Sequence, residues 1–206
     1  MARRKHSVKQ AVRLLARAKL PTRFGTFTVL GARGRRDGEE AVVLLHGTLN
    51  GKSTPLVRVH SQCLTGDVLA SARCDCRAQL ELSLRKIGRA RSGALLYLPQ
   101  EGRGIGLMNK LKAYEWQDKG LDTVEANHKV GFAADLRDYH FPGAVLRKLG
   151  VRRVRLLSNN PDKVKQLEEA GVRVVERIPC QPRTSRLSHA YLHTKKVKLG
   201  HLLRGV

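Results

Sequence analysis

The chain has 206 residues, 41% of them hydrophobic, and its 40 Lys and Arg against 17 Asp and Glu give a formal net charge of +23. This is enough for one α/β domain with a real core, and it argues against wholesale disorder. No run of about twenty apolar residues that could span a membrane occurs. The basic N-terminus lacks the apolar stretch of a secretory signal. Because the cysteines are few and clustered, we expect a cytoplasmic protein without a disulfide framework.

The basic excess is concentrated at the two ends of the chain. Residues 1–37 contain eleven Lys and Arg against Asp37 alone, and no acidic residue occurs from Arg183 to Val206. A field of this sign attracts nucleotides and nucleic acids, although an ordinary solvated face is the alternative. Aromatic residues make up only 4%, and single-strand binders need stacking rings. We therefore expect weak, non-specific nucleic-acid binding rather than nucleic-acid recognition as the main function.

The first half of the chain predicts mainly strands. Residues 8–19 have helical spacing and predict a short amphipathic helix. Apolar runs with β-branched residues then predict strands at 24–29, 41–45 and 56–59. We assign residues 1–18 to a basic N-terminal extension and residues 19–203 to one domain.

The second half alternates helices and strands. Apolar spacing predicts helices at 78–87, 107–119, 144–149 and 163–170, and strands at 94–98, 154–157 and 172–175. Such alternation implies βαβ units. From about residue 183 we expect a basic tail with a last short helix. The predicted fold class is α/β: a mixed sheet flanked by helices, in a single domain.

Three cysteines lie at a spacing that suits one metal ion, Cys63-x10-Cys74-x-Cys76. Thiolates bind zinc at about 2.3 Å, and a catalytic zinc takes three protein ligands and keeps a place for water. The fourth cysteine, Cys180, stands alone, so the count favours an open, hydrolytic site. Buried free cysteines, or a Cys63–Cys74 disulfide, are the alternatives.

Two glycine- or asparagine-containing turns follow predicted strands and open helices. In residues 100–106 the glycines would let backbone N–H groups approach an anion, and the embedded Glu101 and Arg103 favour function over a plain turn. Neither a dinucleotide fingerprint nor a Walker motif is present. In residues 158–163, Asn160 suits a helix N-cap and Lys163 could meet a phosphate, with an ordinary capped helix as the alternative.

Asp135 and Arg137 lie two residues apart. Such a pair does not share a helix face, but on a strand or turn both side chains could point into one pocket. A surface ion pair is the default reading of this pattern.

Six motifs then identify a resemblance. They occur in the order RVHSQCLTGD at 58–67, RCDC at 73–76, QEGR at 100–103, DTVEAN at 122–127, SNNP at 158–161 and GHLL at 200–203. Together they resemble GTP cyclohydrolase II, the enzyme that opens riboflavin biosynthesis, over roughly residues 19–203.

The resemblance implies hydrolysis of GTP to 2,5-diamino-6-(5-phosphoribosylamino)pyrimidin-4(3H)-one, formate and pyrophosphate. It implies one zinc on Cys63, Cys74 and Cys76 whose water attacks C8 of the guanine. Magnesium is expected to accompany the triphosphate. We also expect a homodimer.

The resemblance also assigns roles to single residues. Asp135 matches the family's proton acceptor, and Arg137 matches a residue proposed as nucleophile towards the α-phosphate. Because a guanidinium is protonated at neutral pH, an electrostatic role suits Arg137 better. Tyr114 matches a tyrosine near the zinc water. The expected substrate contacts are Arg58, Val59, His60, Ser61, Gln62, Gln79, Glu101, Gly102, Arg103, Thr123, Ser158 and Lys163.

Two positions depart from the family pattern: Gln62 stands where a glutamate is common, and Ser158 replaces a common threonine. Gln62 and the high charge leave two alternatives open. One is a paralogue of a specialised pathway that gives a formylated or otherwise partial product. The other is a non-catalytic GTP- or nucleic-acid-binding protein on the same scaffold.

Overall fold

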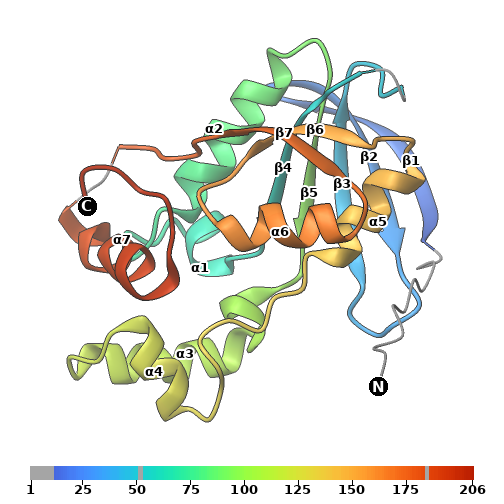
Figure 1. The fold of residues 1–206 in the computed structure, drawn as a ribbon. Coiled ribbons are helices and arrows are strands. Elements are labelled where there is room, and N and C mark those ends of the chain that lie inside the picture. Colours follow the sequence, from blue (N-terminus) through green and yellow to red (C-terminus); the bar gives the residue numbers. More distant parts are fainter. Residues whose placement is uncertain (1–11, 51–52, 184–185) are drawn as a thin grey trace, which may run out of the picture.

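One mixed sheet organises the molecule (Figure 1). The computed structural model describes residues 12–50, 53–183 and 186–206. Within these residues seven strands lie in the order β1-β2-β3-β5-β4-β6-β7. Pairing is antiparallel from β1 to β3 and between β3 and β5, and parallel among β5, β4, β6 and β7. The strands are β1 (Arg13–Thr22), β2 (Gly25–Arg33), β3 (Glu40–His46), β4 (Leu56–Ser61), β5 (Gly93–Leu98), β6 (Arg153–Leu157) and β7 (Arg173–Ile178).

Helices cover both faces of the parallel half of this sheet. Helices α3 and α4 lie beyond the end of strand β5 (Figure 1). The larger core, which includes Val59, Leu96 and Leu146, packs the sheet against α5 and α6. The smaller core, which includes Phe27 and Ile87, packs it against α2. The helices are α1 (Leu64–Asp67), α2 (Cys76–Gly88), the 3-10 turn η1 (Glu101–Gly104), α3 (Leu107–Asp118), α4 (Thr123–Lys129), α5 (His140–Lys148), α6 (Pro161–Glu169) and α7 (Arg186–Leu199).

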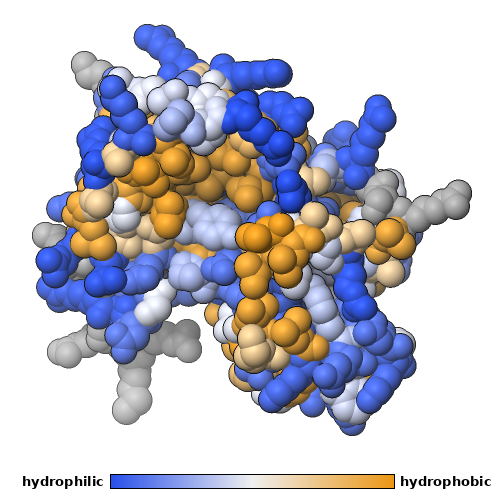
Figure 2. Space-filling model, turned by 180° about the vertical axis from the view of Figure 1, so that it is seen from behind, coloured by the Kyte–Doolittle hydropathy of each residue, from blue (hydrophilic) through white to orange (hydrophobic). Residues whose placement is uncertain are grey.

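The mixed α/β sheet with flanking helices confirms the predicted fold class, and the β6-α6-β7 unit confirms the predicted alternation. No helix within the described residues is long and apolar enough to cross a membrane. Apolar side chains gather on part of the surface seen from behind (Figure 2). Among the exposed apolar residues, Leu15 of β1 and Val42 of β3 are about half accessible, 51% and 49%.

The helix predicted over residues 8–19 is wrong. Residues 8–11 lie outside the described part of the chain, and residues 13–22 form β1, which pairs antiparallel with β2. Nearly all of β1 is exposed. An amphipathic helix here would have no core to cover, whereas the strand gains a ladder of backbone hydrogen bonds. The strand also runs across residue 18, where the predicted N-terminal extension ended.

The C-terminal part is more ordered than the expected basic tail. Residues 184–185 are not described, but α7 is a helix of 14 residues and contacts α4. Helices α1 and α4 were not predicted. For α4 a signal existed, because Asp122 and Glu125 form a capping box in which each side chain accepts from the other's backbone N–H.

In an open α/β sheet, a ligand-binding crevice is expected at the carboxyl ends of the strands, at the point where the strand order reverses. Strand β4 lies between β5 and β6. The connection from β4 to β5 passes through α2 on one face, and the connection from β5 to β6 ends in α5 on the other. The carboxyl end of β4 is therefore the natural ligand position, and the motif RVHSQC lies there.

Candidate active site

Three sulfur atoms meet just beyond the carboxyl end of β4. The Sγ atoms of Cys63, Cys74 and Cys76 lie within 4.8 Å of one another. Cys63 precedes α1, and Cys76 begins α2. All four cysteines are free, and the Sγ atoms of Cys63 and Cys74 are 3.7 Å apart, too far for a disulfide bond. The three sulfurs are therefore close enough to hold one metal ion, as their spacing in the sequence predicted.

The surroundings of the three sulfurs suit a soft cation. A Cβ on Gly66 would lie 2.8 Å from the Cys74 Sγ and 3.1 Å from the Cys63 Sγ, so only glycine leaves room for the cluster. The thiols of Cys74 and Cys76 lower the pKa of Cys63 by hydrogen bonding, and the same sharing raises the pKa of Cys74 and Cys76. Without a cation Cys74 and Cys76 therefore keep their protons, whereas a bound divalent ion would release them. The residues present therefore fit zinc.

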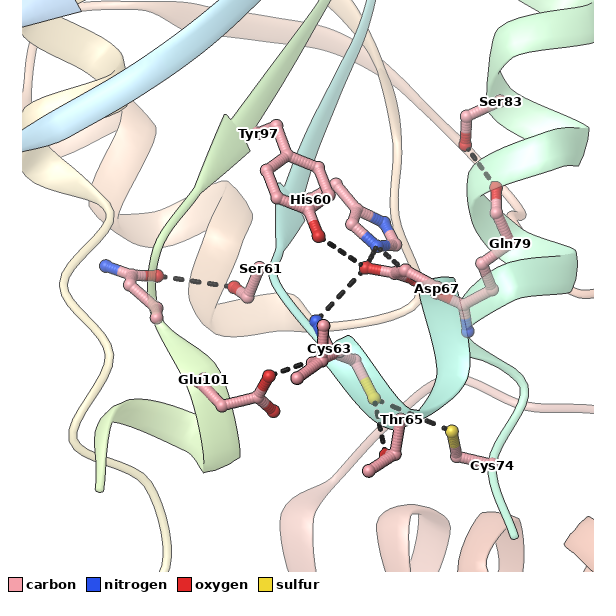
Figure 3. Close-up of polar contacts among 12 residues, drawn as sticks. His60, Ser61, Cys63, Thr65, Asp67, Cys74, Gln79, Ser83, Tyr97 and Glu101 are labelled. Carbon is pink, nitrogen blue, oxygen red and sulfur yellow. Dashed lines mark hydrogen bonds and ion pairs between the residues drawn. The ribbon is translucent and has the colours of Figure 1, made fainter. Parts of the chain in front are cut away.

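A buried carboxylate holds the first cysteine in place (Figure 3). Asp67 accepts hydrogen bonds from the Tyr97 hydroxyl at 2.8 Å and from the Cys63 backbone N–H at 3.0 Å, and it lies 3.1 Å from the His60 Nε2. Burial lowers the pKa of His60 despite this contact, so its imidazole is neutral near pH 7. His60 thus supports the backbone at Cys63 through Asp67.

A second buried pair lies beside the sulfurs. The Lys110 ammonium is 2.7 Å from the Glu101 Oε1, 2.9 Å from the Thr65 Oγ1 and 3.2 Å from the Cys63 Sγ. The other Glu101 oxygen accepts from the Leu64 backbone N–H at 2.6 Å. Lys110 brings a positive charge next to the thiolate cluster. Both oxygens of Glu101, an expected substrate contact, already accept hydrogen bonds within the protein.

The glycine-rich turn presents an arginine with free donors. Gly102 and Arg103 both have φ of 61°, the left-handed region that a residue with a side chain rarely adopts. Among the described residues, both terminal nitrogens of Arg103 are buried without a hydrogen-bond partner. The Arg58 Nε and the Thr123 Oγ1 are also unpaired. The His60 Nδ1 is unpaired as well. Because unpaired buried polar atoms are costly, these four predicted substrate contacts have unused hydrogen-bonding capacity for a ligand.

Cations and polar groups gather at the ends of β4 and β6. Arg58 donates to the Leu157 carbonyl and to the Gln79 Oε1, and Lys163 donates to the Val59 carbonyl at 2.8 Å. Burial, and then the charge of Arg58, lower the pKa of Lys163 well below its usual value. An anion bound here would restore the charge of the lysine.

Asp135 and Arg137 form a direct ion pair in the irregular segment before α5. The Arg137 Nε donates to the Asp135 Oδ1 at 2.8 Å, and a terminal nitrogen donates to the other oxygen. Burial opposes the charge of Arg137, yet the neighbouring Tyr139 and Asp135 raise its pKa. Arg137 is therefore a firmly protonated cation. The Tyr114 hydroxyl lies 3.2 Å from the Thr65 Oγ1.

Two adjoining cavities bring most predicted residues together. The first lies over the sulfurs, and the second lies over the cations. Both share Ser61, Cys76 and Arg137. The first adds Gln62, Cys63, Cys74, Glu101, Gly102, Arg103, Tyr114 and Thr123, and the second adds Arg58, His60, Gln79, Ser158 and Lys163.

Two predicted residues line neither cavity. The Val59 side chain points into the larger core, because alternate residues of a strand face opposite sides of the sheet, and only its carbonyl meets Lys163. Asp135 touches Arg137 but does not line the cavities.

Sequence reasoning missed several residues of the site. Lys110, Asp67 and Tyr97 support the sulfurs, and Tyr191, Lys195 and His201 line the cavities from the C-terminal segment. His201 belongs to the motif GHLL, which the resemblance contained but to which no role was assigned. Asp67 likewise ends the motif RVHSQCLTGD without an assigned role, and for the others only the fold reveals the contact.

The fold and the site define an α/β protein that joins a three-sulfur metal site to a cationic cavity at the carboxyl ends of parallel strands. The family model of GTP cyclohydrolase II matches residues 13–179. The chain belongs to the GTP cyclohydrolase II family, as its motifs predicted.

Curated relatives agree. A GTP cyclohydrolase-2 of Shewanella sp. (strain MR-7) is 50% identical over 193 residues, which cover 94% of this chain and 95% of that protein. A riboflavin biosynthesis protein of Vibrio vulnificus (strain YJ016) is also 50% identical, over 96% of this chain, which spans only 54% of that protein's length. Among solved structures, a two-domain 3,4-dihydroxy-2-butanone 4-phosphate synthase from A. baumannii matches with a TM-score of 0.44 and 20% identity, over 82% of this chain and 40% of that one.

Proposed function

We propose that this chain is a zinc-dependent GTP cyclohydrolase II, which hydrolyses GTP to 2,5-diamino-6-(5-phosphoribosylamino)pyrimidin-4(3H)-one, formate and pyrophosphate at the start of riboflavin biosynthesis. The observation that carries the proposal is the pair of adjoining cavities, one over three cysteine sulfurs and one lined by cations. Ring opening and loss of pyrophosphate occur at opposite ends of GTP, and the two cavities match these two ends.

At the base end, Cys63, Cys74 and Cys76 would hold the zinc. When bound, zinc supplies Lewis acidity and lowers the pKa of a water to about 7. The neighbouring side chains prepare the site: Asp67 orients the Cys63 segment, and Lys110 offsets thiolate charge. The Tyr114 hydroxyl, held by Thr65, faces the same cavity and could exchange a proton with the ring.

At the phosphate end, Arg58, Lys163 and Arg137 would bind and orient the triphosphate, which magnesium accompanies. The Asp135 carboxylate fixes the Arg137 guanidinium by two hydrogen bonds. This pairing favours electrostatic stabilisation of a transferring phosphoryl group by Arg137 over nucleophilic attack, which would require its deprotonation. Asp135 then acts by orienting Arg137 and as a proton acceptor near it.

Mass spectrometry of the products formed from GTP tests the proposed function. We expect formate, pyrophosphate and the diaminopyrimidine in equal amounts. A formylated pyrimidine, or a product that keeps its pyrophosphate, would instead identify a paralogue of a specialised pathway. GTP recovered intact, with zinc present, would identify a non-catalytic protein and refute the proposal.

We further propose that nucleic-acid binding by this chain is weak, independent of sequence and incidental to catalysis. The charge of +23 supports attraction to polyanions, whereas the proposed GTP contacts are a few buried groups. Because counterion release governs binding to nucleic acid, DNA retention should fall steeply between about 50 and 200 mM salt. Formate release should fall much less over the same range. Tight, sequence-selective binding at physiological salt would contradict this prediction.

A further inference from the structure

The C-terminal helix α7 takes part in the ligand cleft. Its Tyr191 lines both cavities, its Lys195 lines the second, and His201, just after the helix, lines the second as well. None of these residues is among the proposed site residues. The helix begins more than a hundred residues after Cys76, the last of the three clustered cysteines. Its position beside α4 is visible in Figure 1.

Specific polar contacts place α7 at the cleft. The Lys198 ammonium pairs with Asp122 and, at 2.8 Å, with the Glu125 Oε1, the two residues of the α4 capping box. After the helix, the Leu202 backbone N–H donates to the Asn159 carbonyl at 2.8 Å. The helix is thus tied to α4 on one side and to the β6–α6 turn on the other.

These ties direct Lys195 into the second cavity. Lys195 is only 8% exposed, and its Nζ lies 3.2 Å from the Asp75 Oδ1 and 4.3 Å from the centre of the Tyr191 ring. An ammonium has three N–H donors. One donor meets Asp75 and one side of the group faces the aromatic ring, which leaves donor capacity towards the cavity.

The second cavity is built for an anion. No Asp or Glu is among its lining residues, whereas Arg58, Arg137, Lys163 and Lys195 are. Asp75 contacts one of these four cations and Asp135 contacts another, and neither carboxylate lines the cavity. Even with Lys163 neutral, Arg58, Arg137 and Lys195 outnumber the two carboxylates, and a polyphosphate would neutralise this excess positive charge.

We propose that α7 forms the phosphate-side wall of the cleft and that Lys195 is a phosphate-binding residue. The identity of the ligand as GTP rests on the proposed function. The Tyr191 ring lies at the junction of the two cavities and, through its contact with Lys195, positions the ammonium.

Calorimetry on the full-length, zinc-loaded protein tests this role. The probes are a GTP analogue with a methylene group in place of the α,β-bridging oxygen, and guanosine, which has no phosphates. Lys195→Met should weaken binding of the analogue about tenfold or more, as expected for a lost charged hydrogen bond. Its affinity for guanosine should stay within about twofold of the wild-type value. Lys195→Arg should restore most of the affinity. Lys196→Met, which removes the same charge from the exposed neighbour, should bind both probes like the wild type.

Two results would overturn the proposal. One is unchanged binding of the analogue by Lys195→Met. The other is equal weakening of both probes together with loss of zinc, because Lys195 would then only support Asp75, between the metal-site residues Cys74 and Cys76. Formate release, measured in parallel, separates the two proposals. A wild-type protein that binds the analogue through Lys195 but releases no formate would refute the cyclohydrolase function alone.

Discussion

Replacing Cys74 or Cys76 by serine is expected to remove zinc and ring opening together. The wild-type protein should carry about one zinc per chain, because three thiolates whose Sγ atoms lie within 4.8 Å form a strong soft site. A serine hydroxyl at one position is a much poorer ligand, so the metal is lost and formate release falls to background. Metal analysis of the purified variants, with formate and pyrophosphate assays, measures the effect.

The fourth cysteine supplies the matched control. Cys180 is fully buried, contacts the Ser83 hydroxyl and the Gln79 carbonyl, and is not part of the three-sulfur cluster. Cys180→Ser should therefore keep its zinc and most of its activity, whatever it costs in stability. Full formate release from a zinc-free preparation of the wild type would refute a catalytic role for the metal.

Replacing Arg137 by alanine is expected to reduce pyrophosphate release by about 10²- to 10³-fold, the range for removal of one electrostatic stabiliser of a transition state. The protonated guanidinium is held by Asp135 at the boundary of the two cavities. The zinc content should not change, because Arg137 makes no contact with the cysteine sulfurs among the described interactions. Separate assays for formate and pyrophosphate show whether the two hydrolyses depend on one another.

Arg137→Lys is the informative companion of this variant. Lysine keeps the positive charge but cannot make the two-point contact with Asp135. Partial recovery of pyrophosphate release in Arg137→Lys would support an electrostatic role. Formate and pyrophosphate release at wild-type rates in Arg137→Ala would show that Arg137 has no chemical role.

The fold class and the family could be predicted from the sequence because both depend on local signals. The alternation of apolar runs and helical spacing from residue 144 onwards identified β6, α6 and β7. The spacing of the three cysteines identified the metal cluster, since residues 74 and 76 are neighbours and the turn through α1 returns the chain to Cys63. The short Asp135–Arg137 spacing likewise allowed a direct contact, and the two side chains form an ion pair, although only Arg137 lines the cavities.

The predictions that failed concern residues whose state depends on distant partners. Val8, Val12 and Leu15 have helical spacing, but the segment from Arg13 follows the exposed edge of β2, because pairing with a strand outweighs weak local preference. Likewise, the segment after residue 183 looks like a solvated tail when it is read alone, because no acidic residue occurs within it.

By itself, the sequence determined most of the strands and helices, the cysteine cluster and the family, since periodicity, turn residues and close spacing act over short distances. Only the tertiary structure decided which charges are buried together. Lys110 meets Cys63 across 47 residues, and Lys195 meets Asp75 across 120. A buried ion pair has no local pattern, because each partner is an ordinary lysine or carboxylate until the fold removes both from water.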